Sequence, residues 1–350
     1  MVILGADTHK STHTVVAIDE VGQQLAERTV PATPAGHRVV MAWAGQFAER
    51  RWALEDVRHL SRRLEADLLR AGEHVVRVPT RLMGAARRAG RERGKSDPID
   101  ALATARAALR EPDLPEAFLE GDERELRLLV DHREDLVAER TRMENRLLWD
   151  LHELLPGYVV APRSLGRRKV LDELAAVLAG IEGLVAEIAR ERLARIRQLT
   201  VRVNELEREI ARRTTVIAPA LLALAGCGPL SAAKLVGETA RAGRFRSRAA
   251  FARHNGTAPI PVSSGNRDRQ RLNRGGNRQI NCALHRIAIT QMQHPGPGRS
   301  YIERRQLAGD TKTEAIRALR RRISDEVFRR LLIDERSRST MPRACVQAAA

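Results

Sequence analysis

Short apolar runs alternate with amphipathic stretches over the first 80 residues of this 350-residue chain, and this alternation constrains its fold most. Residues 1–30 contain three strand-like segments separated by turns, which predicts an antiparallel meander. Helical spacing and short apolar runs then follow one another at residues 34–48, 51–56, 61–72 and 74–79. Strands that alternate with helices predict an α/β domain with a partly parallel sheet, which we assign to residues 1–115.

Two long, charged helical segments follow, at residues 122–155 and 169–213. In the second segment, apolar residues recur every seven positions in two sets, with one step of eight between the sets. The two sets are Leu174, Ile181 and Ile188, and then Ile196, Val203 and Ile210. An antiparallel helical hairpin and a dimerising coiled coil fit this pattern equally well. We assign residues 120–215 to a helical coiled-coil spacer that mediates dimerisation.

The composition changes again in the last third of the chain. Between residues 241 and 278 there are ten arginines and a single acid, Asp268. Residues 277–292 and 311–332 have helical spacing, which predicts a mostly α C-terminal domain over residues 216–334. We expect residues 335–350 to form a disordered tail.

The charge balance predicts a polyanionic partner. The chain carries 61 Lys and Arg residues against 44 Asp and Glu residues, for a formal net charge of +17, which favours nucleic acid. Only five of the basic residues are lysines, and the fork of an arginine suits phosphate. Codon bias in a GC-rich genome is an equal explanation for the arginine excess, but it does not explain the net charge.

Several classes of protein are disfavoured. No apolar run reaches 18 residues and no signal-peptide pattern is present, so we expect no membrane partner. The three cysteines, Cys227, Cys282 and Cys345, are too widely spaced for a zinc site or a disulfide framework, which favours a cytoplasmic setting. The histidines show no ligand spacing: His9 and His13 would share a strand face, but they lack a third partner.

Acidic residues follow the predicted strands. Asp7 ends the first strand and Glu55 ends another, and ligand sites of open α/β sheets form at such carboxyl ends. In the stretch KSDPIDA, Asp97 and Asp100 lie three residues apart, beside a proline that favours a helix start. Asp97 as a helix cap is the simpler interpretation of this stretch alone. If the helix packs near the first strand, however, all four carboxylates converge, and Mg²⁺ or Mn²⁺ would relieve their repulsion.

The order of GADTHK, ALED and KSDPIDA resembles the DEDD-type insertion-sequence transposases, the IS one-ten family. The resemblance implies a RuvC-like, ribonuclease H-type N-terminal fold whose four acids match Asp7, Glu55, Asp97 and Asp100. In the family a Thr- or Gly-containing run often follows the glutamate, whereas Asp56 follows it here, so Asp56 is the alternative to Glu55.

A second part of the resemblance lies in the C-terminal region. There the family has an Arg-Phe pair, an alanine-rich helix and a Ser-Gly pair before a basic run, and Arg244-Phe245 and Ser264-Gly265 match it. The resemblance implies that Ser264 is a nucleophile that forms a phosphoserine link to DNA, with Ser263 as the alternative. We expect nearby arginines to stabilise or neutralise phosphate charge. These arginines are Arg244, Arg267, Arg269, Arg271, Arg274 and Arg278.

The sequence Gly226-Cys227-Gly228-Pro229 separates two helical stretches and looks like the turn of a helix-hairpin-helix motif. We expect the backbone N–H groups around Gly226 and Gly228 to contact a nucleic-acid backbone, with a plain helix–helix corner as the equal alternative. Cys227, at the tip, is expected to pack rather than to react.

Together these features predict a DNA transposase that cleaves and rejoins strands. The resemblance also implies an element-encoded bridge RNA that pairs with donor and target DNA, and a dimer or tetramer of the protein. One alternative is a junction-resolving endonuclease that uses water as its nucleophile. The other is an architectural nucleic-acid-binding protein without catalysis.

Overall fold

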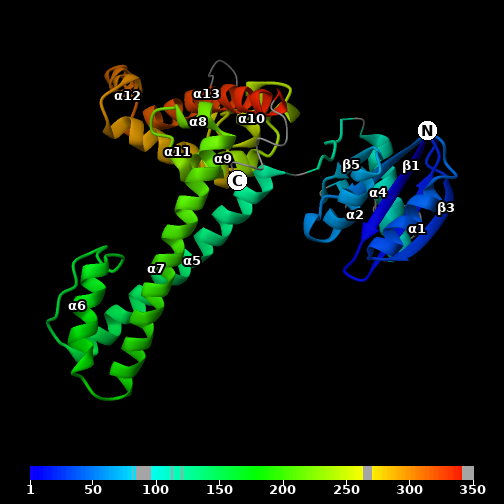
Figure 1. Ribbon diagram of the computed structural model, residues 1–350. Coiled ribbons are helices and arrows are strands. Elements are labelled where there is room, and N and C mark those ends of the chain that lie inside the picture. The colour runs from blue at the N-terminus through cyan, green and yellow to red at the C-terminus, as the bar shows by residue number, and fades with distance from the viewer. Residues whose placement is uncertain (81, 84–95, 112, 120, 263–269, 341–350) are drawn as a thin grey trace. The chain divides into compact units, whose positions relative to one another are not determined.

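A computed structural model describes the chain except for residues 81, 84–95, 112, 120, 263–269 and 341–350. The chain divides into two compact units, Met1–Glu120 and Gly121–Ala350 (Figure 1). Among the described helices, none is both long enough and apolar enough to cross a membrane.

A five-stranded mixed sheet forms the centre of the first unit, with the strand order β3-β2-β1-β4-β5. The strands are β1 (Val2–Thr8), β2 (Thr12–Ile18), β3 (Gln24–Pro31), β4 (Arg50–Glu55) and β5 (Val75–Val78). The first three strands form an antiparallel meander, and β4 and β5 run parallel to β1. The predicted α/β fold with a partly parallel sheet is therefore confirmed.

Helices cover both faces of this sheet, as Figure 1 shows. Helices α1 (Pro34–Ala44) and α2 (Arg58–Arg70) pack on the face that carries Leu4 and Trp52. Helix α4 (Asp97–Arg110) packs on the opposite face with Ile3. Because side chains alternate along a strand, the residues of β1 divide between two cores.

Helix α4 lies unusually close to β1 at Gly5. A Cβ atom on Gly5 would lie 2.3 Å from the carbonyl oxygen of Ala101 and 2.4 Å from the backbone nitrogen of Ala105. Only glycine on the strand, facing alanines on the helix, allows this approach. The alanine-rich composition of α4 is thus a packing requirement.

We expect Gly5→Ala to push α4 away from the sheet and to destabilise the first unit by about 1–3 kcal/mol, the usual cost of overpacking. The measurement is the urea midpoint at which β1 and β4 lose protection in pulsed hydrogen exchange. Gly166→Ala is the control, because a Cβ there meets no atom within 4 Å. Equal midpoints for Gly5→Ala and the wild type would contradict the steric constraint.

A buried pair of histidines lies on the other face of the sheet. The rings of His13 and His37 stack with their centroids 5.2 Å apart, and His37 Nδ1 lies 2.6 Å from Asp67 Oδ2. His13 Nδ1 and His37 Nε2 have no hydrogen-bond partner among the described residues. The pKa of His13 is lowered to about 4, mainly because the side chain is buried and also because His37 lies next to it.

This lowered pKa predicts that acid destabilises the first unit. An unfolded His13 takes up a proton near its ordinary pKa of 6.5, whereas the folded one does so only near 4. The unfolded state therefore binds more protons in this window, and stability falls as the pH falls through it, by up to about 3 kcal/mol. Urea midpoints of the β2 amides near neutral pH and at about pH 5 measure the loss. His13→Gln should show a smaller loss and His294→Gln, at an exposed site, the full one; equal losses in all three proteins would rule out His13 as the cause.

The second unit is built on an antiparallel helical hairpin of α5 (Asp122–Leu154) and α7 (Leu184–Ile217). Ion pairs link the two helices along their length, among them Arg133 with Glu207 and Arg195 with Glu139. Leu126 and Ile217 belong to one apolar core, and Leu147 and Ile196 belong to another. Within one chain, α5 and α7 therefore pair as an antiparallel hairpin. Dimerisation through these helices remains a prediction.

The segment predicted as one helix over residues 169–213 is two helices, α6 (Arg168–Ala179) and α7. The break lies at Gly180–Gly183, where Gly183 has φ +108°, a conformation that side chains disfavour. Only the second heptad set lies wholly on one helix, and its three members are buried.

The rest of the second unit is mostly helical. Its elements are α8 (Pro219–Leu222), α9 (Pro229–Thr239), the 3₁₀ turn η1 (Ala242–Arg244), α10 (Arg248–His254), β6 (Ile260–Pro261), β7 (Gln270–Arg271), α11 (Arg278–Gln293), α12 (Pro297–Leu307) and α13 (Lys312–Thr340). These elements share an apolar core with the N-terminal end of α5 and the C-terminal end of α7.

The predicted disorder from residue 335 begins too early, because α13 continues to Thr340. Asp334 accepts hydrogen bonds from the backbone N–H groups of Ala220 and Leu221, and Arg338 pairs with Glu123. These contacts hold the last turns of α13 against α8 and α5. The remainder of the predicted tail, residues 341–350, lies outside the described residues.

Candidate metal centre

The register of two parallel strands brings Asp7 and Glu55 to one edge of the sheet. The last paired residues of β1 and β4 are Ala6 and Leu54, and both pack into the same core. The next residue on each strand, Asp7 and Glu55, therefore points to the opposite face, which is the face that α4 covers. Glu55 is half-buried at the end of β4.

The alternative to Glu55, Asp56, lies beyond the end of β4. Its backbone N–H donates to the carbonyl oxygen of Val78, and the residue is exposed. Alternation along the strand directs consecutive residues to opposite faces, which favours Glu55 over Asp56 as the partner of Asp7.

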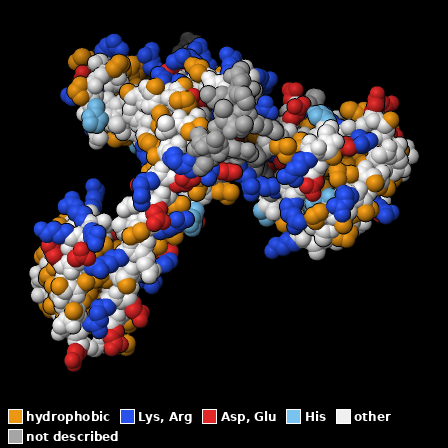
Figure 2. Space-filling model, in the orientation of Figure 1, with side chains coloured by type: hydrophobic (Ala, Val, Ile, Leu, Met, Phe, Trp, Pro, Cys, Tyr) orange, Lys and Arg blue, Asp and Glu red, His pale blue; other side chains and the backbone are white. Residues whose placement is uncertain are grey.

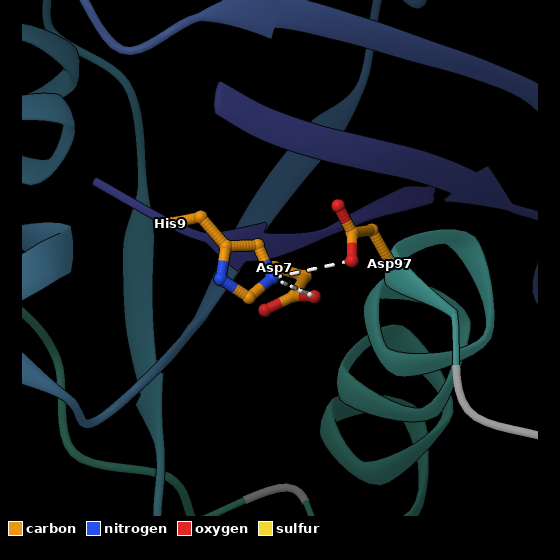
Figure 3. Close-up of side chains that lie close together, drawn as sticks. All are labelled: Asp7, His9 and Asp97. Atoms are coloured by element: carbon orange, nitrogen blue, oxygen red, sulfur yellow. Dashed lines mark hydrogen bonds and ion pairs between the residues drawn. The ribbon is translucent and has the colours of Figure 1, made fainter. Parts of the chain in front are cut away.

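The first turn of α4 carries the other two acids. The helix begins at Asp97, and the N–H of Asp100 donates to the carbonyl oxygen of Ser96 at 3.0 Å. Ser96 is thus the N-cap residue, and Asp97 is the first residue of the helix. The prediction that Asp97 is the N-cap residue is therefore wrong by one position. The carboxylate of Asp97 instead turns toward β1 (Figure 3).

The structure brings Asp97 and Asp100 close enough to Asp7 to perturb its ionisation. The pKa of Asp7 is raised, first because the side chain is buried and also because the negative charges of Asp100 and Asp97 lie nearby. The positive potential of His9 opposes this shift only in part. The site therefore concentrates negative charge, which a bound cation would relieve.

One ring nitrogen of His9 faces two of these acids, as Figure 3 shows. Its Nε2 atom is 3.1 Å from Asp7 Oδ2 and 3.3 Å from Asp97 Oδ1. Among the described residues, these three form a group whose donor atoms all lie within 4.8 Å of one another. The sequence pairs His9 with His13 and offers no third ligand, whereas the structure groups His9 with Asp7 and with Asp97, which is distant in sequence. The only sequence signal was the Asp-x-His spacing at the end of a strand, which places both side chains on one face.

The predicted nucleophile cannot be placed in the same way. Ser264, its alternative Ser263, and two of the predicted phosphate ligands, Arg267 and Arg269, lie outside the described residues. The strands on either side of this segment, β6 and β7, pair with each other, with Ile260 opposite Arg271.

The other predicted phosphate contacts lie on the described surface. Arg271, Arg274 and Arg278 are exposed, and Arg278 begins α11. Arg244 is also exposed, but its guanidinium lies 4.2 Å from the ring centroid of Phe245 and donates to the carbonyl oxygen of Thr239. Figure 2 shows Lys and Arg side chains spread over both units. Packing therefore already occupies Arg244, whereas the other three present their charge to solvent.

In the glycine turn before α9, Gly226 is needed for close packing against α11. Gly226 has φ +78°, and a Cβ there would lie 3.1 Å from the carbonyl oxygen of Ile287 on α11. Cys227 is buried, which raises the pKa of its thiol to about 12 and leaves it inert at neutral pH. Gly228 is exposed at the N-terminus of α9, so a phosphate contact there remains a prediction.

Comparison with known proteins assigns the family. A family model of DEDD-type IS110 transposases matches residues 4–156, and a model described as transposase of the IS116/IS110/IS902 family matches residues 218–303. The chain is 30% identical to the 44.8 kDa protein of insertion element IS116 from Streptomyces clavuligerus, over 93% of each chain. It is 26% identical to the 42 kDa protein of insertion element IS900 from Mycobacterium paratuberculosis, over 91% of this chain and 92% of that one.

Among solved structures, the chain is similar to Thermus thermophilus RuvC in complex with a Holliday junction substrate. The match has 18% identity and a TM-score of 0.26, and it covers 31% of this chain and 94% of that chain.

The family models define the chain as a transposase, and the described residues Asp7, His9 and Asp97 form a group that could hold a metal ion. The chain is a member of the IS116/IS110/IS902 family of transposases, as the sequence motifs predicted. Membership implies an enzyme that binds DNA and cleaves nucleic acid.

We expect Asp7→Asn to stabilise the first unit when metal is removed. A folded pKa that is raised above the ordinary value means that the charged form is disfavoured in the folded state, so stability is lost as the pH rises through that pKa. Asparagine carries no charge and should raise the free energy of unfolding at neutral pH by about 1 kcal/mol. The urea midpoint of the β1 amides in the presence of a chelator measures this gain.

The same experiment with Mg²⁺ should reverse the order of the two proteins, because a bound ion stabilises only the wild type. Asp113→Asn, at an exposed acid, is the control and should follow the wild type in both conditions. A loss of stability in Asp7→Asn in the presence of chelator would contradict the charge repulsion described above.

Proposed function

We propose that this transposase cleaves and rejoins DNA strands through a metal site formed by Asp7, Glu55, Asp97 and Asp100, with Ser264 as nucleophile. One observation carries the proposal. The first turn of α4 brings two aspartates to the end of β1, and the pKa of Asp7 is raised there, first by burial and then by the negative charges of Asp100 and Asp97. Such perturbed groups cluster at functional sites, because catalytic groups need pKa values that suit their task.

The donor set fits a hard divalent cation. Carboxylate oxygens are the ligands that Mg²⁺ prefers and that Mn²⁺ also accepts. When bound, such an ion polarises a phosphodiester and stabilises the attacking and leaving oxygens. The chain's own contribution is to hold the acids rigidly: two at the ends of neighbouring strands, and two on a helix that Gly5 fixes against the sheet.

The serine step conserves the phosphodiester. The Oγ atom of Ser264 bonds to phosphorus and loses its proton to a base, while one DNA oxygen leaves and takes up a proton. The serine–DNA link that results can be attacked by a DNA hydroxyl, which restores a DNA phosphodiester without ATP. Ser263 is the alternative nucleophile. Exposed arginines such as Arg271 and Arg274 would hold the phosphate backbone.

The partners follow from the family and from the charge. We propose that the protein binds donor and target DNA together with an element-encoded guide RNA, and that it acts as a dimer or tetramer. A net charge of +17 supports polyanionic partners of either kind.

Two substitutions test the mechanism. Asp97→Asn should abolish strand cleavage and leave DNA affinity unchanged, because the site acts on the chemical step. Ser264→Ala should abolish the covalent protein–DNA adduct, because alanine has no nucleophile. The measurements are DNA binding by gel shift and adduct formation on a denaturing gel, followed by peptide mapping of the modified residue.

Asp113→Asn and Ser300→Ala, at exposed positions, serve as matched controls and should behave as the wild type. Loss of the adduct in Ser263→Ala instead would move the nucleophile by one residue. Cleavage without an adduct in Ser264→Ala would favour an endonuclease that uses water. Variants that change only DNA affinity would favour the architectural alternative.

A further inference from the structure

The position of His9 follows from a tight connection between β1 and β2. Its backbone N–H donates to the carbonyl oxygen of Thr12 at 2.9 Å, which closes the turn directly after β1. Because His9 lies two residues after Asp7, both side chains point to the face that α4 covers. The imidazole is thus held at the metal site by local backbone geometry.

One nitrogen atom of His9 faces two carboxylates. Nε2 lies 3.1 Å from Asp7 Oδ2 and 3.3 Å from Asp97 Oδ1, as Figure 3 shows. A single N–H group points well at only one acceptor. Ligands of one cation, at about 2.1–2.2 Å from it, lie about 3.0–3.5 Å from each other in octahedral or tetrahedral geometry. The two observed separations fall in this range, and one ligand atom from each of the three residues lies within 4.8 Å of the others, so the three side chains can converge on one ion.

Access also suits a ligand role. The side chains of His9 and Asp97 are each 48% exposed, whereas that of Asp7 is 9% exposed. The site is therefore anchored at Asp7 and open on the side of His9 and Asp97, where an ion and a phosphate oxygen can enter.

We propose that His9 is a metal ligand through Nε2, and that this nitrogen shifts the site from a preference for Mg²⁺ toward Mn²⁺. This inference rests on the metal site proposed above. Mg²⁺ favours an all-oxygen set, whereas imidazole suits first-row transition metals, whose affinity rises along the series that begins with Mn²⁺. A site of carboxylates and one imidazole is therefore a mixed nitrogen and oxygen site.

Pulsed electron paramagnetic resonance of Mn²⁺ on the full-length protein tests this directly. The wild type should show coupling of the Mn²⁺ electron spin to a directly bound ¹⁴N nucleus, and His9→Gln should lose this coupling. Glutamine keeps a polar side chain that can hydrogen-bond to the acids, so a purely hydrogen-bonding role would survive the change. Calorimetric titrations with Mn²⁺ and Mg²⁺ should show that the preference for Mn²⁺ falls about tenfold in His9→Gln, equivalent to about 1.4 kcal/mol.

His59→Gln, at an exposed histidine of the same unit, is the matched control and should keep both the coupling and the preference. Mn²⁺ that binds the wild type without nitrogen coupling, or coupling that persists in His9→Gln, would overturn the role of His9 and leave the carboxylate site standing. If Mn²⁺ does not bind, or binds equally to the wild type, Asp7→Asn and Asp97→Asn, the carboxylate site itself is wrong and the proposed function fails with it.

Discussion

The close approach of α4 to β1 at Gly5 is the constraint on which the candidate site depends. A strand and a helix pack this tightly only where the strand has no side chain and the helix presents alanines. This contact fixes the position of α4 along β1, so the first turn of α4 lies beside the end of β1. Asp97 and Asp100 reach Asp7 for this reason, and no local preference of the helix start would bring them there.

The site carries a cost that the rest of the first unit must offset. Three aspartates gather at one edge of the sheet, and the pKa of Asp7 is raised there by its burial and by the negative charges of Asp100 and Asp97. The imidazole of His9 opposes this charge only partly. Two dense apolar cores, one on each face of the sheet, supply the stability that lets such an arrangement persist.

In the second unit, the residues that hold the helices together differ from those that we propose for nucleic-acid contact. Ion pairs and buried leucines hold α5 against α7, and the arginine-rich stretch leaves Arg271, Arg274 and Arg278 in solvent. The predicted nucleic-acid-binding turn at Gly226-Cys227-Gly228 likewise contains residues needed for packing and one exposed residue. Gly226 is required by its packing against α11, and Cys227 is a buried thiol, whereas Gly228 is exposed.

The sequence by itself determined the mixed α/β fold, the hairpin as one of two options, the transposase family and the four candidate acids, because periodicity and ordered motifs are local properties. It missed the break at Gly180–Gly183 and placed the helix start near Asp97 one residue late, because ends of helices depend on neighbouring contacts. Only the tertiary structure decided that His9 meets Asp97. These two residues are 88 positions apart, and the packing of α4 on the sheet brings them together. Local sequence patterns do not predict such a contact.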